Sequence, residues 1–394
     1  MPHTSRTLRF FLWCTPLLLT FGAAAQSLIP PGAKLEKIAT GILQPEGPIW
    51  IDTLGLLFSD IAGNKIYRFS PADSSLSVFL NPSDSSNGMT LDLQGRLILT
   101  QMGLRRVSRR DANGTITPLA STYKGKKFNS PNDVVVKSDS SIYFTDPDFN
   151  IPKGENAELS FKGIFRISPS GALTLLDSTL DKPNGICFSL DESKLYVNES
   201  AQAKIYVWDV AGDSITNKRL FFQIPATGYV DGMKIDPKGN IYCSGPNGVW
   251  IVSDSGVYLD KISMETPSNC NWGDADRKTL YITAGNSLYR IRLATTTGVR
   301  DHGSLQPRSF NLYANYPNPF NPATTINYQL AMNSMVALNV YDPLGREVAM
   351  LVNEERPAGT YSVQWNAVGF SSGTYFYRLR AGNLDETRKM ILLR

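Results

Sequence analysis

The sequence predicts an all-β protein, a six-bladed β-propeller followed by a small C-terminal β-sandwich. One segment pattern recurs six times between residues 43 and 293, and self-similarity of this kind is typical of propeller blades. The 394-residue chain also contains 31 Gly and 24 Pro. Its short apolar runs are separated by these turn residues, as they are in folds made of many short strands.

Each repeat opens with a carboxylate or carboxamide, continues with mostly apolar residues, turns at an Asp, Gly or Ser cluster and enters a second apolar run. A further pair of short strands follows, so each repeat supplies the four strands of one blade. We expect residues 33–40, which precede the first repeat, to form the outermost strand of the last blade and close the ring, which removes exposed sheet edges. The opening residues of the six repeats are Glu46, Asn87, Asn132, Asn184, Asp231 and Asn269.

Residues 1–25 are predicted to be a secretory signal peptide. Arg6 and Arg9 precede an apolar run, and three alanines end at Ala25, as at a signal cleavage site. The apolar run is shorter than the roughly 20 residues of a membrane-spanning helix. We therefore expect no transmembrane segment in the mature protein, whose propeller would occupy residues 26–293.

Charge and the scarcity of two residue types exclude several functions. The net charge is +4, with 39 basic and 35 acidic residues interspersed, so no basic surface for nucleic acid is predicted. Cleavage of the leader leaves an odd number of cysteines, Cys187, Cys243 and Cys270, which we expect to be buried free thiols. The two histidines, His3 and His302, lie outside the repeats, which excludes a Ser-His-Asp triad and an imidazole zinc site in the propeller.

The opening residues of the repeats predict one oxygen-lined site. The first strand of a blade lies nearest the propeller axis, so six equivalent residues face one another at the mouth of the channel. A single Asn-Gly or Asp-Gly indicates only a turn. Six oxygen-bearing residues at the same position in successive repeats instead favour one ligand that all six share. Glu46 and Asp231 would repel each other unless a divalent cation lies between them.

The predicted cofactor is one divalent cation. Oxygen donors favour Ca²⁺, Mg²⁺ or Mn²⁺ over softer metals, with Zn²⁺ as a substitute, and we expect Ca²⁺. Such an ion polarises a substrate carbonyl and acidifies the attacking water. Asp231 is the candidate for accepting a proton from that water.

Several motifs resemble, in order, the gluconolactonase and regucalcin (senescence marker protein) family of six-bladed propellers. They are EGPIW, SNGMTLD, NSPNDVVV, KPNGICF, DGMKID and SNCNWG, and together they cover roughly residues 36 to 293. The resemblance implies a lactonase dependent on calcium or another divalent metal, with a small lactone or ester as its substrate.

The resemblance also assigns residues. The family's metal ligands fall on Glu46, Asn184 and Asp231, its fourth metal-facing or substrate-side residue falls on Asn132, and its general base falls on Asp231. Asn87, Asn132 and Asn269 match substrate-pocket positions. Regucalcin-type members have an Arg two residues before the matching Asn, whereas this chain has Ser130. The NSPND motif instead resembles the bacterial gluconolactonase branch.

Two other functions fit the same sequence. A similar metal site could hydrolyse a phosphotriester, and a propeller without catalysis could bind a sugar or a protein at its mouth. The insertion at residues 147–163, rich in polar residues, Gly and Pro, is either a lid over the substrate or an ordinary surface loop.

The C-terminal region is predicted to consist of a linker at residues 294–310 and a β-sandwich at residues 311–394. YPNPFNPATTI and the terminal KMILLR resemble the sorting domain that the type IX secretion system recognises. The resemblance implies that the type IX machinery is a partner and that the protein reaches the exterior or surface of a Gram-negative bacterium. A sandwich alone also fits an immunoglobulin-like adhesion or binding module.

Overall fold

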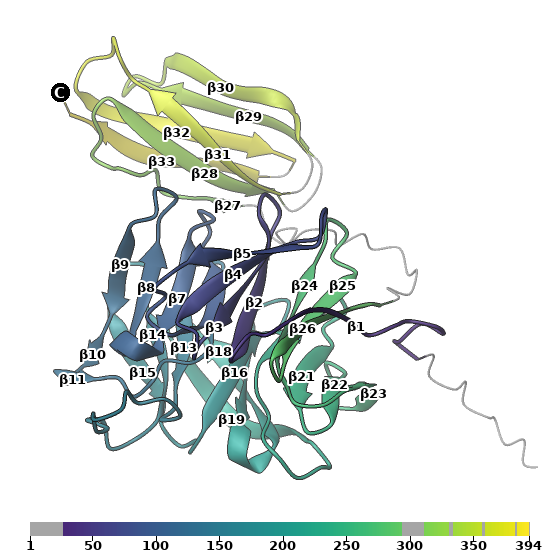
Figure 1. Ribbon diagram of the computed structural model, residues 1–394. Helices are drawn as coiled ribbons and strands as arrows, with labels where there is room; N and C mark the ends of the chain where they lie inside the picture. Colours follow the sequence, from purple (N-terminus) through teal and green to yellow (C-terminus); the bar gives the residue numbers. More distant parts are fainter. Residues whose placement is uncertain (1–26, 294–310, 331–333, 357–358, 383, 394) are drawn as a thin grey trace, which may run out of the picture.

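The structure, a computed structural model, describes residues 27–293, 311–330, 334–356, 359–382 and 384–393 (Figure 1). The predicted signal peptide and the predicted linker at residues 294–310 lie outside these residues. Regular structure in the described part of the chain is β-strand, apart from two short 3₁₀ turns, η1 (Met102–Leu104) and η2 (Ser200–Gln202). The prediction of an all-β protein is confirmed.

The first three blades are four-stranded antiparallel sheets whose strands follow chain order. They consist of β2 (Pro45–Ile51), β3 (Gly55–Asp60), β4 (Lys65–Ser70) and β5 (Ser75–Leu80); β6 (Ser86–Leu91), β7 (Leu97–Gln101), β8 (Arg106–Arg110) and β9 (Ile116–Ala120); and β12 (Val134–Val136), β13 (Ile142–Asp146), β14 (Gly163–Ile167) and β15 (Leu173–Asp177). A two-stranded hairpin, β10 (Thr122–Tyr123) and β11 (Lys126–Lys127), separates the second and third blades.

The fourth and fifth blades have the same order, and the sixth takes one strand from the start of the chain. They consist of β16 (Pro183–Phe188), β17 (Lys194–Glu199), β18 (Lys204–Ala211) and β19 (Ser214–Gln223); β20 (Met233–Ile235), β21 (Ile241–Gly245), β22 (Gly248–Val252) and β23 (Tyr258–Ser263); and β24 (Pro267–Gly273), β25 (Thr279–Ala284), β26 (Ser287–Arg292) and β1 (Glu36–Thr40).

The innermost strands close a ring. Strands β2, β6, β12, β16, β20 and β24 contact one another in this order, and β24 contacts β2 again. Strand β1 pairs with β26 at the outer edge of the sixth blade, as the sequence predicts. The pairing joins the first and last strands of the propeller and so closes the ring.

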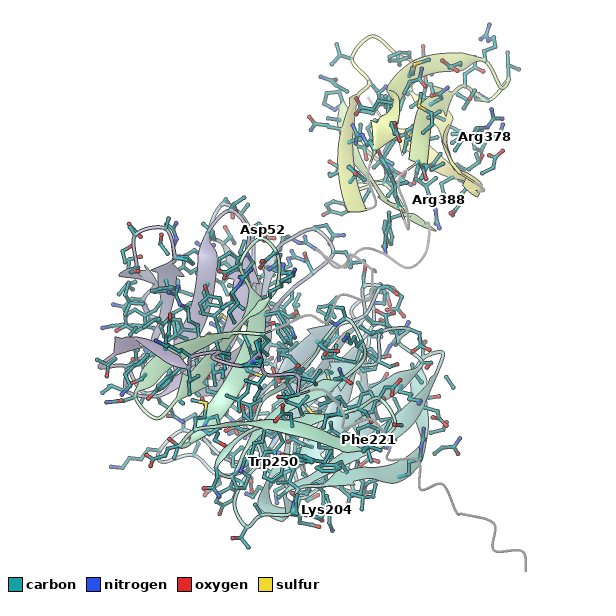
Figure 2. The ribbon with its side chains drawn as sticks, turned by 90° about the vertical axis from the view of Figure 1, so that its right-hand side faces the viewer. Asp52, Lys204, Phe221, Trp250, Arg378 and Arg388 are labelled. Carbon is teal, nitrogen blue, oxygen red and sulfur yellow. The ribbon has the colours of Figure 1, made fainter. Side chains whose placement is uncertain are left out.

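The core consists of apolar layers between neighbouring blades. Between blades four and five, Cys187 and Cys243 pack with Trp250, and Phe221 of β19 covers the cluster. Trp250 and Phe221 are labelled in the lower part of Figure 2. The three cysteines of the described region are buried and free. Interdigitated side chains of this kind hold each blade to the next.

The C-terminal region forms a separate β-sandwich. Its first sheet contains β27 (Asn311–Leu312), β28 (Ala323–Leu330) and β31 (Gly359–Asn366), and its second contains β30 (Glu347–Arg356), β29 (Ser334–Tyr341), β32 (Gly373–Ala381) and β33 (Leu384–Leu392). Tyr328 and Trp365 of the first sheet share one core with Leu338 and Tyr377 of the second. Within the described ranges, none of the helical segments has the length and apolar character to traverse a bilayer.

We predict that Phe165→Ala destabilises the propeller by about 3–5 kcal/mol, because it removes a buried aromatic side chain from a packed layer. Phe165 is fully buried and contacts Phe128 and Phe144 at ring-centroid distances of 5.1 and 5.3 Å. Urea unfolding followed by tryptophan fluorescence measures the change. Leu220→Ala, at a position 52% exposed, is the control and should change stability by less than about 0.5 kcal/mol; equal losses would contradict the packing described.

Candidate active site at the channel mouth

The six opening residues lie at or just before the start of the innermost strands. Glu46, Asn87, Asn132, Asn184 and Asn269 are each at most 5% exposed. Asp231, two residues before the start of β20, is half-buried. Because the innermost strands form a closed ring, these residues surround one end of the channel.

Glycines permit this convergence. The glycine after Asp231 is so close to the next blade that an added Cβ at Gly232 would lie 2.0 Å from Cγ of Asn269. An added Cβ at Gly185 would lie 2.5 Å from the carbonyl oxygen of Asp231. Gly88, Gly185 and Gly232 have no left-handed backbone conformation. The interpretation of these Asn-Gly and Asp-Gly pairs as turns is therefore wrong. Glycine is required at these positions because neighbouring blades approach too closely for a side chain.

Glu46 is held in place by two hydrogen bonds. Its Oε2 atom accepts one from the backbone N–H of Gly47 at 2.8 Å and one from Nδ2 of Asn269 at 3.0 Å. Burial raises the pKa of Glu46 to about 7, although both hydrogen bonds favour its ionised form. Asn269 in turn accepts a hydrogen bond from the N–H of Cys270 at 2.9 Å, which orients its amide toward Glu46.

Asp231 is destabilised as an anion. Burial, and then the charge of Glu46, raise the pKa of Asp231 well above its ordinary value, although a hydrogen bond from the Asn184 side chain favours the ionised form. Two carboxylates close enough for the charge of one to raise the pKa of the other favour a proton or a cation between them. The structure thus brings Glu46, Asn184 and Asp231 together, as the sequence predicts.

The donor set fits a hard cation. Oδ1 of Asn184 is buried and has no hydrogen-bond partner among the described residues, although a buried carbonyl oxygen normally has one. A divalent ion bound by Glu46 and Asp231 would provide that partner. Within the described ranges, no group of three or more His, Cys, Asp or Glu side chains is placed to hold a metal. The candidate site therefore depends on carboxamide oxygens as well as two carboxylates.

Sequence reasoning missed two charged residues beside the site. Asp133 follows Asn132, its side chain is 2% exposed, and its Oδ2 lies 3.5 Å from Nζ of Lys234. Burial has the largest single influence on Lys234 and lowers its pKa, but the charge and hydrogen bond of Asp133 together with the thiols of Cys270 and Cys187 raise the pKa overall. The sequence contained one signal for this pair, a lysine (Lys234) in the otherwise apolar strand β20. A charged residue in such a strand indicates a partner, since charged residues are rarely buried without one.

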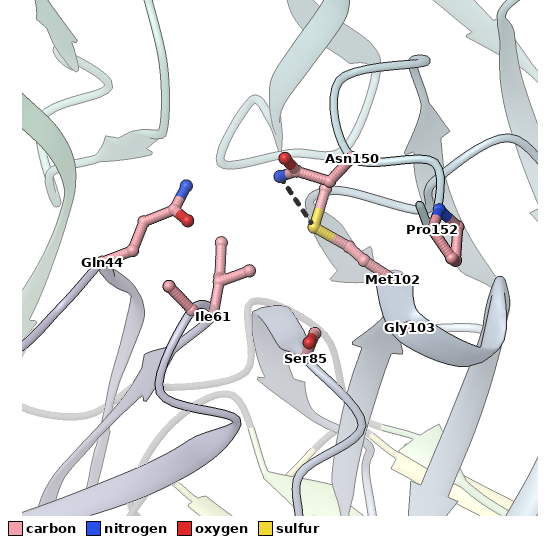
Figure 3. A pocket seen from close by; sticks show the side chains of 8 residues that line it. Gln44, Ile61, Ser85, Met102, Gly103, Asn150 and Pro152 are labelled. Atoms are coloured by element: carbon pink, nitrogen blue, oxygen red, sulfur yellow. Dashed lines mark hydrogen bonds between the residues drawn. The ribbon is translucent and has the colours of Figure 1, made fainter. Parts of the chain in front are cut away.

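A cavity of about 290 Å³ adjoins the site (Figure 3). The Met102 sulfur accepts hydrogen bonds from Nδ2 of Asn87 at 3.6 Å and from Nδ2 of Asn150 at 3.5 Å. Asn150 belongs to the 147–163 insertion, so the insertion borders the cavity. The lining residues are Gln44, Ile61, Ala62, Ser85, Met102, Gly103, Asn150 and Pro152.

Ser130 anchors the start of the insertion. Its Oγ donates to the carbonyl oxygen of Pro147 at 2.7 Å and accepts from the N–H of Asn150 at 3.3 Å. Ser130 is fully buried. A small buried side chain therefore positions this part of the cavity wall.

Arg105 and Asp146 form a buried polar cluster beneath the insertion. Arg105 donates to the carbonyl oxygen of Phe128 and to Glu155 of the insertion. Oδ2 of Asp146 accepts from the N–H of Asn129 at 2.8 Å, whereas its Oδ1 has no partner in the described part of the chain. Burial raises the pKa of Asp146 to about 7, although hydrogen bonds from Asn129 and the charge of Arg105 oppose the shift.

Comparison with known families gives two matches. The family described as SMP-30/Gluconolactonase/LRE-like region matches residues 44–286. The Secretion system C-terminal sorting domain matches residues 314–393. The first match covers most of the propeller, and the second covers most of the sandwich.

Individual proteins agree with the first match. A gluconolactonase from Zymomonas mobilis is 33% identical over 306 residues, which cover 70% of this chain and 85% of that protein. Regucalcin from Xenopus laevis is 25% identical over 249 residues, 61% of this chain and 82% of that protein. The solved structure of a gluconolactonase from Xanthomonas campestris has a TM-score of 0.65 and 32% identity, covering 69% of this chain and 94% of that one.

We predict that Asp146→Asn stabilises the protein increasingly as pH rises from about 4 to about 7. The wild-type carboxyl has a pKa of about 7 when folded, against an ordinary value of 3.8, so its ionisation opposes folding across that range, by at most about 1.4 kcal/mol per pH unit. Thermal unfolding at pH 4.5, 6 and 8 measures the difference between variant and wild type. Asp254→Asn, in an exposed turn, is the control; a difference for Asp146→Asn that does not vary with pH would refute the prediction.

Proposed function

Because the chain belongs to the SMP-30/gluconolactonase/LRE-like family, we propose that it is an exported hydrolase of a lactone and that it depends on one divalent cation. The observation that carries this proposal is the meeting of Glu46 and Asp231 beside the unpartnered Oδ1 of Asn184. Oxygen donors of this kind suit Ca²⁺, and they also accept Mg²⁺ or Mn²⁺.

Four residues are proposed to hold the ion: Glu46, Asn132, Asn184 and Asp231. When bound, a divalent ion supplies a Lewis acid for the ester carbonyl and lowers the pKa of water beside it. Asn269 positions Glu46 through its 3.0 Å hydrogen bond. We therefore interpret Asn269, expected from the sequence as a substrate-binding residue, chiefly as a support for Glu46.

Asp231 is proposed as the general base. It accepts a proton from the water that attacks the carbonyl carbon, and the ring C–O bond then breaks. The same carboxyl returns the proton to the leaving alkoxide, so the product is a hydroxy acid. A carboxylate whose pKa is raised by burial is better suited to this exchange near neutral pH than an exposed one.

The cavity beside Asn87 is proposed to receive the body of the lactone. Gln44, Ser85 and Asn150 provide polar groups, whereas Ile61 and Pro152 provide apolar surface. Among the described residues, Nδ2 of Asn87 donates to the Met102 sulfur, a weak acceptor. Its amide can therefore exchange this contact for a substrate oxygen at low cost.

The sorting domain directs the place of action. Its match at residues 314–393 supports export by the type IX secretion machinery to the cell surface or the exterior. The signal peptide at residues 1–25 is proposed as the leader for the first membrane crossing. The substrate is then a lactone outside the cell.

Asp231→Ala is predicted to remove lactonase activity, lowering kcat/KM by more than about 100-fold. Loss of a residue that only supports a metal ligand typically lowers activity about 10- to 100-fold, and loss of a ligand itself lowers it further. A pH-indicator assay of acid release from a panel of lactones measures turnover. Asp254→Ala, in an exposed turn of the same blade, is the matched control and should leave kcat/KM unchanged. Near-normal turnover of every lactone by a folded Asp231→Ala variant would exclude the mechanism.

Chelation is predicted to abolish turnover and lower the melting temperature, and added Ca²⁺ should restore both. A ligand that binds only the folded state stabilises it by about 2.7 kcal/mol at a concentration 100 times its Kd. Assay and differential scanning calorimetry before and after chelation and Ca²⁺ addition test this. The catalytic role of the ion is wrong if a chelated sample shown by elemental analysis to be metal-free retains full activity.

A further inference from the structure

A buried ion pair lies beside the proposed metal site, and three blades hold it in place. Oδ1 of Asp133 accepts from the N–H of Val134 at 2.9 Å, and Oδ2 accepts from the N–H of Ile186 in the fourth blade at 3.4 Å. Lys234 of the fifth blade approaches Oδ2 at 3.5 Å and donates to its neighbouring carbonyl, that of Met233, at 3.1 Å. These contacts fix both charged groups at the channel.

The pair lies beside three of the four proposed metal ligands. Asp133 directly follows Asn132, and it accepts the N–H of Ile186, two residues after Asn184. Lys234 lies three residues after Asp231. A buried ion pair contributes little net stability, because desolvation offsets much of the attraction between its charges. The position of the ion pair beside the site therefore indicates a role other than stabilising the fold.

We propose that Asp133 and Lys234 set the charge of the channel mouth so that it accepts a single divalent cation, an inference that rests on the proposed metal dependence. Three carboxylates, those of Glu46, Asp133 and Asp231, and one ammonium group leave two negative charges. One divalent ion neutralises them. Without the ammonium the mouth carries three negative charges, and without the Asp133 carboxylate it carries one.

The inference predicts opposite effects on metal binding for two near-isosteric variants. Asp133→Asn, which keeps an oxygen acceptor for one of the two backbone N–H groups, should weaken Ca²⁺ binding by roughly tenfold, and Lys234→Met should strengthen it by roughly tenfold, because each changes one charge near the ion. The double variant should return to within about threefold of wild type, because the two charge changes cancel. Isothermal titration of Ca²⁺ into the chelator-treated full chain measures affinity and stoichiometry, with one ion expected per wild-type chain.

Two controls separate charge from shape. Lys234→Arg keeps the positive charge and should bind Ca²⁺ within about threefold of wild type. Thermal unfolding in chelator shows whether each variant is folded before the metal is added. The inference is overturned if Asp133→Asn and Lys234→Met shift the affinity in the same direction, if neither shifts it, or if Lys234→Arg changes it as much as Lys234→Met. A folded wild-type chain that binds no divalent ion overturns the proposed metal dependence as well, whereas binding by wild type without opposite shifts overturns this inference alone.

Discussion

Repulsion between two buried carboxylates is the constraint on which the site depends. Closure of six blades into a ring brings Glu46 and Asp231, which are 185 positions apart in the numbering, into one electrostatic environment. Burial raises the pKa of each, and the charge of Glu46 raises that of Asp231 further. The surrounding residues moderate this repulsion by hydrogen bonds from Asn269 and Asn184 and by the ammonium of Lys234. This arrangement is the basis of the proposed divalent-cation site.

Close packing of the inner strands creates that environment. The glycine after an opening residue contacts the backbone or side chain of the next blade, as at Gly185 and Gly232. Any larger residue there would push the blades apart and separate the oxygen donors. The same dipeptides that close the ring therefore also determine how near the ligands come to one another.

Connections between the strands of the blades form much of the cavity wall. The 147–163 insertion is anchored by Ser130 and Arg105 and contributes Asn150 to the cavity wall. Met102 of η1 links Asn150 to Asn87. The repeats thus supply the proposed hydrolytic centre, whereas the insertion and η1 shape the space that a substrate would occupy. The sandwich serves export rather than chemistry in this division.

The sequence by itself determined the six blades, the closing strand β1, the sandwich and the oxygen-bearing residue that opens each repeat. These features follow from the local alternation of apolar and polar residues and from the return of the same kind of residue at the same position in each repeat. Only the tertiary structure decided which of these residues meet. It showed that Asn269 supports Glu46, that glycine is needed for blade contact rather than for turns, and that Asp133 pairs with Lys234. Such contacts join different blades, so no local pattern records them. Their geometry follows from ring closure, which places side chains from distant repeats within hydrogen-bond distance.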